Sequence, residues 1–345
     1  MSTPTAPPPG GRPGHRTGPA APGVPATAAP SAGTPATVQP ATPPGSGRPP
    51  GDTPRAPRPR LTAGQRFARG GWKHLAAIAA CLFALFPLVY ALSASLSASG
   101  SLIGSNRLFS DVTGANYTNL LGDPQNPYLT WFGNSLFVSV TTAVGTVLMG
   151  AAAAYAFSRF RFRSRKGGLM ALLIIQMFPQ LLAFVAIFLL LFAISEVYPF
   201  LGLNSRLGLV AVYLGGALGA NTFLMYGFFN TIPKDLDEAA EIDGASHAQI
   251  YWTMILPLVT PILVVVGMLS FIASFSDFLL AQIVLQDPDK YTLAVGLYQF
   301  VSVQFGENWG VFTAGAILAA VPVVAQFLFL QRYIVSGLTG GAVKG

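Results

Sequence analysis

The sequence predicts an all-α integral membrane protein with about six transmembrane helices and a disordered N-terminal tail. Of its 345 residues, 52% are hydrophobic and only 10% are charged, whereas soluble domains carry roughly 25% charged residues. Long apolar runs follow one another through most of the chain, and a proline-rich segment precedes them. This much apolar surface exceeds what a water-soluble core can hide, so we expect lipid to be the solvent.

The N-terminal segment, residues 1–60, differs sharply in composition from the rest of the chain. It holds 18 of the 28 prolines, and almost no large apolar side chain appears before Leu61. Such a segment cannot bury enough apolar surface to offset the entropy of ordering, so we expect it to be disordered. It contains six arginines and one acid, Asp52, and no apolar stretch typical of a signal peptide. The sequence favours a solvated cytoplasmic tail with weak attraction to anionic lipid; a docking role is the alternative.

Residues 61–345 form the predicted transmembrane domain. A membrane-spanning helix needs about 20 mostly apolar residues. Apart from Arg332 at the end of the last run, the only charged residue in these runs is Asp277. The runs are too long and too uniformly apolar for β-barrel strands, and a segment in lipid must satisfy its own backbone as a helix. The predicted spans are 75–96, 131–157, 169–195, 207–229, 258–284 and 310–333.

Lysine and arginine predict the orientation, because they are enriched in cytoplasmic loops. With six spans and both termini in the cytoplasm, only Arg107, Arg206 and Lys290 fall outside, and the other 17 of the 20 basic residues fall inside. The sequence therefore predicts a multi-pass protein of the cell (plasma or inner) membrane, with both termini cytoplasmic.

Small polar residues recur at helical spacing inside two of the spans. Ser135, Ser139 and Thr142 share one face of the second span, as do Ser270, Ser274 and Asp277 in the fifth. Such residues indicate either close helix packing or the lining of a solute path, and the pattern does not choose between them.

Charge inside a span is costly, about 2.5–3.5 kcal/mol at the centre of a helix on insertion scales. Asp277 lies toward the outer end of its span, so we expect it either at the rim of a water-filled cavity or paired with another subunit. In the third span, Pro179 lies between two glutamines and predicts a local kink or a polar pocket. The candidate pathway-lining residues are Gln176, Gln180, Asn221, Ser274 and Asp277.

The predicted cytoplasmic loop 231–257 carries the strongest local signal, and its pattern predicts two short helices. Pro233 suits the start of the first, with acidic residues near its positive end. Gly244 suits its end, Ser246 is a candidate N-cap for the second helix, and Pro257 limits that helix. The first helix has an apolar side with small residues. That side either packs back on the bundle or docks a partner.

This loop resembles the EAA loop of ABC importer permeases: Glu-Ala-Ala, three residues, Gly, nine residues, an aliphatic residue, one residue, Leu-Pro. Met254 replaces the usual isoleucine, which keeps the apolar character. The resemblance implies a type I permease bundle whose loop docks into a separate ATP-hydrolysing subunit. This chain has no phosphate-binding G-x-x-x-x-G-K-[ST] motif, so we expect a transport subunit rather than an enzyme. The implied coupling residues are Glu238, Ala239, Ala240, Gly244, Leu256 and Pro257.

Three further segments, 153–162, 291–297 and 331–345, resemble carbohydrate-type (MalFG) permeases of maltose transporters. The resemblance implies that a final tail reaches the ATPase interface and that an external loop contacts a sugar-binding protein. That loop could equally be an ordinary interfacial loop with Trp309 as a membrane anchor. The implied tail residues are Gly341, Ala342, Val343, Lys344 and Gly345, and the implied loop residues are Phe305, Gly306, Glu307, Asn308 and Trp309.

The resemblance also implies the partners and the substrate class. The partners are a second, MalF-like permease that supplies most of the sugar site, a MalK-like dimer of ATP-binding subunits, an extracytoplasmic sugar-binding protein and membrane lipid. The substrate is a maltose- or maltodextrin-type sugar. Another oligosaccharide or a polyol, such as trehalose or cyclodextrin, stays open as the substrate.

Other classes of protein fit the sequence less well. An ion-coupled secondary transporter usually carries several intramembrane charges and inverted repeats. A membrane enzyme would need a catalytic or metal-binding cluster, but Cys81 stands alone and His247 is expected on a helix surface. No cofactor or metal is expected. The basic residues do not form the basic-aromatic face that nucleic acid requires.

Overall fold

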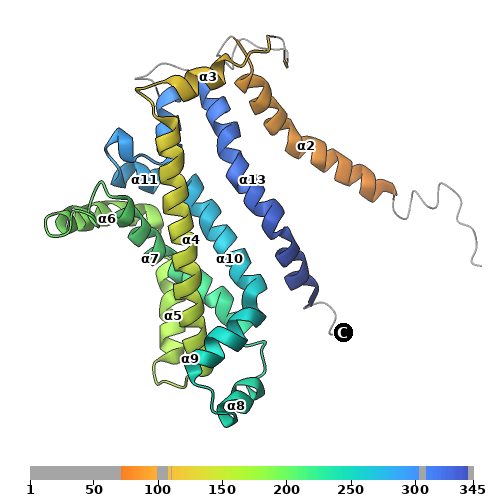
Figure 1. Ribbon diagram of the computed structural model, residues 1–345, viewed down its shortest axis with the longest axis vertical. Coiled ribbons are helices and arrows are strands. Elements are labelled where there is room, and N and C mark those ends of the chain that lie inside the picture. The colour runs from red at the N-terminus through yellow and green to blue at the C-terminus, as the bar shows by residue number, and fades with distance from the viewer. Residues whose placement is uncertain (1–70, 99–107, 110, 303–307, 341–345) are drawn as a thin grey trace, which may run out of the picture. The chain divides into compact units, whose positions relative to one another are not determined.

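The computed structural model describes residues 71–98, 108–109, 111–302 and 308–340, except for the side chains of residues 180 and 334–340. The described residues are overwhelmingly helical (Figure 1), and the only β-type pairing among them is an isolated bridge between Ser97 and Val112. The predicted tail of residues 1–60 lies outside the described residues. The all-α prediction is confirmed for the described residues.

The main helices follow the apolar runs of the sequence, and shorter helices connect them. In chain order they are α2 (Trp72–Ser95), α3 (Ala115–Gly122), α4 (Tyr128–Arg159), α5 (Arg165–Gln176), α6 (Gln180–Ser195), α7 (Arg206–Phe229), α8 (Asp235–Ile242), α9 (His247–Gln249), the π-helix η2 (Ile250–Ile255), α10 (Leu256–Ser276), α11 (Leu279–Val284), η3 (Pro288–Lys290), α12 (Leu293–Tyr298), η4 (Gln299–Val301) and α13 (Trp309–Gly340).

Five helices in the described part are long and apolar enough to cross a membrane, and a sixth crossing requires the bent pair α5 and α6. The predicted third span, 169–195, is therefore not one continuous helix: its two halves meet at an angle of 102°. Pro179 explains the break, because its ring removes a backbone donor and disfavours a helical conformation at the preceding Phe178. The sequence located the kink but not its size.

The predicted fifth span, 258–284, is displaced in the structure. Its helix ends at Ser276, because Asp277 has an extended backbone (φ −69°, ψ 128°). The next helix, α11, begins at Leu279. At the other end the helix runs back without interruption to His247. The expected end at Pro257 is wrong, since the preceding π-helical segment η2 has a wider turn that accommodates a proline ring.

Helix α4 is the centre of the packing, since it contacts both α7 and α10; α10 also packs against α13, and α13 against α2. Apolar side chains join these helices in three clusters. The one that includes Tyr155, Phe229 and Ile250 connects α4 and α7 to the segment leading into α10. The one around Trp131 connects α4 to α12 and α13, and the third lies around Leu209 and Val284.

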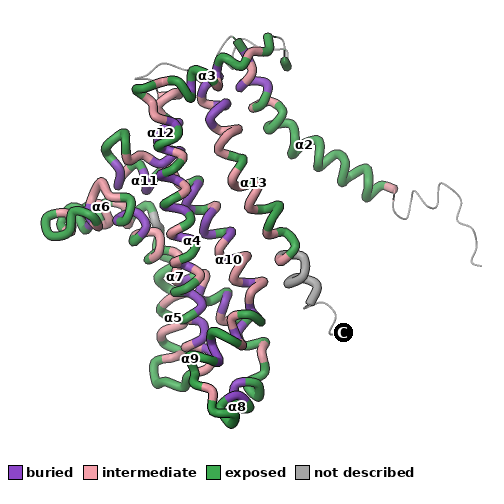
Figure 2. The backbone as a smooth tube through the Cα atoms, viewed as in Figure 1, coloured by how far each residue is buried: buried purple, intermediate pink, exposed green. Residues whose placement is uncertain are grey.

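Helix α2 is exposed along nearly its whole length (Figure 2), and only Ser93, Ala94 and Ser95 at its end are buried. Its exposed side chains are large and apolar; Phe83, for example, is 84% exposed. In a membrane such a surface faces lipid tails or an apolar partner, which is consistent with the sequence-based prediction of a span here.

The end of α4 at Trp131 and Asn134 is fastened to the loop that follows α11. The Trp131 indole donates a hydrogen bond to the Pro288 carbonyl at 2.8 Å. The Asn134 amide donates to the carbonyls of Asp289 and Tyr291, and its oxygen accepts from Arg206 at 2.8 Å. In the same loop, hydrogen bonds from Asn204 and Lys290 lower the pKa of Asp287. These bonds fix one end of the bundle.

Replacing Gly296 with alanine should destabilise this end. A Cβ at this position would lie 2.2 Å from ring atoms of the fully buried Trp131, and overpacking of this kind costs about 1–3 kcal/mol. We expect a lower thermal unfolding midpoint in detergent. Gly133→Ala on α4 is the control, because its Cβ would meet nothing within 4 Å. Equal midpoints for the two variants would contradict the packing described here.

Candidate coupling joint and pathway cavity

The first part of loop 231–257 folds as the sequence predicts. Helix α8 has Asp235, Asp237 and Glu238 in its first turn, where carboxylates favour the positive end of the helix dipole. It ends at Ile242, and Gly244 follows in the left-handed conformation at φ +85°.

The end of α8 is a Schellman motif, in which two backbone amides after the helix bond back to its last carbonyls. The Gly244 amide donates to the Glu241 carbonyl at 3.0 Å, and the Ala245 amide donates to the Ala240 carbonyl at 2.9 Å. The next helix then begins with a capping box between Ser246 and Gln249. The predicted roles of Gly244 as helix terminator and of Ser246 as N-cap are confirmed.

Helix α8 has one face on the bundle and one face exposed, so the sequence-based alternative of packing on the bundle holds for one face, and docking of a partner stays a prediction for the other. Ala240 is buried, as is Asp237. On the opposite side Ile242 is 87% exposed, and Leu236, one turn before Ala240 at the edge of the buried face, is 41% exposed. Most of the other implied coupling residues are exposed to solvent: Glu238, Ala239, Gly244 and Pro257. Leu256 is half-buried.

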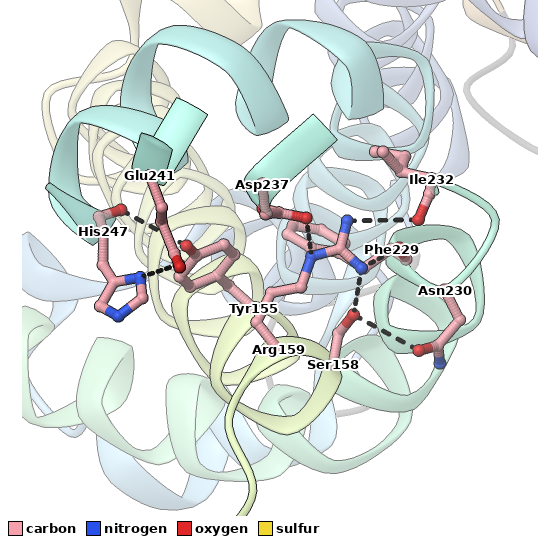
Figure 3. Close-up of polar contacts among 9 residues, drawn as sticks. All are labelled: Tyr155, Ser158, Arg159, Phe229, Asn230, Ile232, Asp237, Glu241 and His247. Carbon is pink, nitrogen blue, oxygen red and sulfur yellow. Dashed lines mark hydrogen bonds and ion pairs between the residues drawn. The ribbon is translucent and has the colours of Figure 1, made fainter. Parts of the chain in front are cut away.

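An ion pair that the sequence analysis missed fastens α8 to α4 (Figure 3). Arg159 Nε lies 2.9 Å from Asp237 Oδ2, and the two side chains are only 6% and 11% exposed. The Nε–H does not point along this line, so the contact is an ion pair rather than a hydrogen bond. Arg159 also donates to the carbonyls of Phe229 and Ile232, each at 3.3 Å.

Two weaker contacts surround this ion pair (Figure 3). The Tyr155 hydroxyl, one turn earlier on α4, donates to the His247 carbonyl at 3.4 Å. The His247 ring lies 3.3 Å from the Glu241 carboxylate, and both side chains are exposed. His247 therefore lies on the surface of its helix, as predicted.

The basic loop after α4 and the coupling loop lie at the same end of the bundle, because Arg159 joins them. Arg206 and Lys290 lie at the opposite end, beside Asn134 and the loop after α11. The described basic residues thus divide between the two ends as the sequence-based topology requires, although this division does not itself say which end is cytoplasmic.

A cavity of about 1020 Å³ lies among α4, α5, α6, α7, α10 and α11, at the upper end of the usual range for small-molecule sites. Four of the five predicted pathway residues line it: Gln176, Asn221, Ser274 and Asp277. The fifth, Gln180, is the first residue of α6, and its side chain is not described. Three aromatic residues also line the cavity: Phe178, Phe184 and Tyr213.

Asp277 lies in the cavity wall, where α10 breaks. Its Oδ2 accepts a hydrogen bond from the Tyr213 hydroxyl at 2.7 Å and from the Ala281 amide at 3.1 Å. Its other oxygen has no hydrogen bond to a described residue. Of the two alternatives left open by the sequence, the structure supports the cavity position.

The remaining polar groups of the wall are neutral. Gln176 donates to the Gly216 carbonyl at 2.9 Å, and the Asn221 amide lies 3.5 Å from the Ser270 hydroxyl. Ser274 donates to carbonyls of its own helix. Thr142 is 2% exposed, and its hydroxyl has no partner among the described residues.

The two serines that precede Thr142 on the same face of α4 do not line the cavity. Ser135 accepts a hydrogen bond from the Leu293 amide at 2.7 Å, whereas Ser139 is fully buried without a described partner. The predicted polar face of this helix therefore serves packing at Ser135 and lines the cavity only at Thr142.

The predicted external loop is only partly described. Asn308 accepts a hydrogen bond from the Val311 amide at 3.3 Å and so caps α13. Trp309 begins that helix, half-buried, with its ring against Phe312. Residues 305–307 and the predicted interface tail, residues 341–345, lie outside the described residues. No cluster of three or more potential metal ligands occurs in the described part.

Sequence reasoning also missed Tyr213. Tyr213 is surrounded in the sequence by apolar residues, and its hydrogen-bond partner Asp277 lies 64 residues later. No local pattern therefore marks it as part of a polar site. Arg159 was counted as a topology signal and as part of the segment 153–162, and the basic residues that follow it in the sequence gave no sign of an acidic partner.

The comparisons with known proteins agree with this arrangement. Residues 146–340 match the family model described as binding-protein-dependent transport system inner membrane component. The solved structure of a bacterial ABC transporter involved in the import of the acidic polysaccharide alginate contains a chain that is 25% identical. The match has a TM-score of 0.66 and covers 80% of this chain and 99% of that one.

Curated relatives are more similar in sequence. The galactooligosaccharides transport system permease GanQ of Bacillus subtilis is 38% identical over 282 residues, 81% of this chain and 98% of GanQ. The maltose/maltodextrin permease MalG of Yersinia pestis is 40% identical over 277 residues, 77% of this chain and 91% of MalG. The maltodextrin permease MdxG of Bacillus subtilis is 43% identical over 218 residues, 63% of this chain and 76% of MdxG. The chain therefore belongs to the binding-protein-dependent transport system inner membrane components, as a sugar permease subunit of the MalG type from an ABC importer.

Proposed function

We propose that this permease passes maltose- or maltodextrin-type sugars across the cell membrane, driven by ATP hydrolysis on a separate subunit. The observation that carries the proposal is helix α8. It has one face fastened to the bundle, and Ile242 is 87% exposed on the other. Because this exposed side belongs to the helix that carries the Glu-Ala-Ala segment, outside the spans, it is suited to contact with a protein partner.

The proposed partner at α8 is a dimer of MalK-like ATP-binding subunits, and the implied coupling residues form the contact. We place this end of the bundle, and both termini, in the cytoplasm. The basic residues after α4 support that orientation, because lysine and arginine are enriched on the cytoplasmic side. The tail 341–345 is proposed to reach the same ATPase interface.

The proposed sugar path runs through the cavity beside Asp277. Its neutral amides and hydroxyls are suited to the hydroxyl groups of a sugar, and its aromatic side chains are suited to the apolar faces of sugar rings. A second, MalF-like permease completes the path and supplies most of the sugar site. At the opposite end, loop 305–309 is proposed to contact an extracytoplasmic sugar-binding protein.

A galacto-oligosaccharide is the second candidate substrate. GanQ, whose name states such a substrate, is matched over 98% of its length. The cavity lining does not distinguish the two classes of sugar, because both present the same hydroxyl groups.

Uptake of radiolabelled maltotriose into a deletion strain complemented with the full-length chain tests the proposal. We expect uptake that unlabelled maltodextrins inhibit, that ATP depletion abolishes and that a protonophore spares while ATP is maintained. Inhibition by galacto-oligosaccharides instead would favour the second substrate. Uptake that survives ATP depletion but not the protonophore would contradict an ATP-driven mechanism and favour an ion-coupled transporter.

A further inference from the structure

The contact between Arg159 and Asp237 is unusual among the ion pairs of the described residues because it is buried. The other two, His247 with Glu241 and Lys290 with Asp287, have side chains that are 44–61% exposed. Solvent-exposed pairs contribute little to rigidity. A buried pair resists separation, because removing either charge leaves the other without a partner in a poorly solvated site.

Arg159 is also well placed to hold more than one element. It is the last residue of α4, and its guanidinium reaches Asp237 on α8 and the Phe229 and Ile232 carbonyls at the end of α7. One side chain thus joins two spanning helices to the coupling helix. Its two terminal nitrogens donate to the carbonyls, while its charge holds Asp237.

Besides this pair, α8 is held by the apolar packing of Ala240 in the cluster that contains Tyr155 and by the chain at its two ends. The chain enters it through residues 230–234 and leaves it through Gly244, where the helix ends. The Tyr155 contact reaches the next helix rather than α8 and is long, at 3.4 Å. Of the polar side-chain contacts described for α8, the Asp237 ion pair is the one that ties it to α4.

Helix α4 leads from this pair to the cavity. Thr142, which lines the cavity wall, lies on the same continuous helix as Arg159, roughly 25 Å away at 1.5 Å per residue. A helix of this length moves nearly as a rigid body, so a displacement of its end by α8 shifts the cavity wall.

We propose that Arg159 and Asp237 form a positioning pair that makes α4 move with α8, so that motion of the docked ATPase changes the cavity. Neither residue lines the cavity, so the role we propose for both is one of positioning. The inference rests on the proposed function, and it adds a specific role for two residues outside the docking face.

The test uses the complex purified through the full-length chain and reconstituted in proteoliposomes with its sugar-binding protein. The readout is the amount of radiolabelled maltotriose transported per ATP hydrolysed. We expect Asp237→Asn and Arg159→Gln each to lower this ratio at least fivefold while the ATPase still copurifies. The double variant should be no worse than either single variant, because each one alone breaks the same contact.

Matched controls separate the pair from general effects of charge. Asp111→Asn makes the same change at an exposed position away from α8, and Arg161→Gln makes it just beyond α4, also at an exposed position. Both should keep the wild-type ratio. The conservative variants Asp237→Glu and Arg159→Lys, which keep the charges, should recover at least half of it, and they provide the readout if the neutral variants do not insert.

A wild-type ratio in both neutral variants would overturn the inference. So would loss of the ATPase from the complex with a normal ratio in the complexes that remain, since the pair would then serve assembly only. Failure of the proposed function would give a different result: no ATPase would copurify with the wild-type chain.

Discussion

Replacing Gly244 with valine should reduce sugar uptake at least tenfold while leaving membrane insertion unchanged. Gly244 has φ +85°, and a residue with a Cβ costs roughly 1–2 kcal/mol in a left-handed conformation. Valine is β-branched and less tolerant still. A cost of this size shifts the balance between the formed and frayed end of α8 by about 5- to 30-fold, and the docking face frays with it. Uptake of radiolabelled maltotriose and the amount of protein in the membrane are the measurements.

Gly244→Asn is the matched control, because asparagine tolerates the left-handed conformation better than other residues with a side chain. There is open space around the position, with nothing within 4 Å of a Cβ, so side-chain volume alone is not the obstacle within this chain. Asparagine should therefore retain most of the uptake. Equal losses for valine and asparagine would show that backbone conformation is not the reason for the glycine.

Replacing Asp277 with asparagine should raise the KM for sugar uptake at least tenfold with little change in the amount of complex. Asp277 lines the cavity; one of its oxygens has no hydrogen bond to a described residue, while the other is held by Tyr213 and Ala281. A hydrogen bond to a charged group contributes roughly 1.5–3 kcal/mol, or about 10- to 150-fold in binding. Asparagine still offers an oxygen to Tyr213, so the fold of this region should persist.

Asp111→Asn is the control for this substitution, since Asp111 is an exposed acid away from the cavity. The initial rate of maltotriose uptake, measured over a range of sugar concentrations for each variant, separates KM from the maximal rate. An unchanged KM in Asp277→Asn would mean that the carboxylate makes no contact with the sugar and serves only to end α10.

Local features of the fold could be predicted from sequence, because their causes are local. Apolar runs specify spanning helices through the cost of exposing backbone to lipid. Gly244 and Ser246 act on the residues next to them, so their roles as helix terminator and N-cap could be read directly. The candidate cavity residues were identified because polar side chains are rare and costly in spans.

Features that depend on distant residues could not be predicted in this way. Arg159 and Asp237 are 78 positions apart, and nothing in the local pattern of either specifies the other. The size of the bend at Pro179 depends on what surrounds α5 and α6, not on the proline alone. The helix through Pro257 continues because η2 is π-helical, which sequence periodicity does not reveal.

Affinity purification of the full-length chain in detergent, with identification of its partners and assay of their ATPase activity, tests the account most directly. We expect an ATP-hydrolysing subunit to copurify in stoichiometric amount with the wild-type chain and to be depleted in Gly244→Val. A stable, transport-active preparation that contains no such subunit would contradict it.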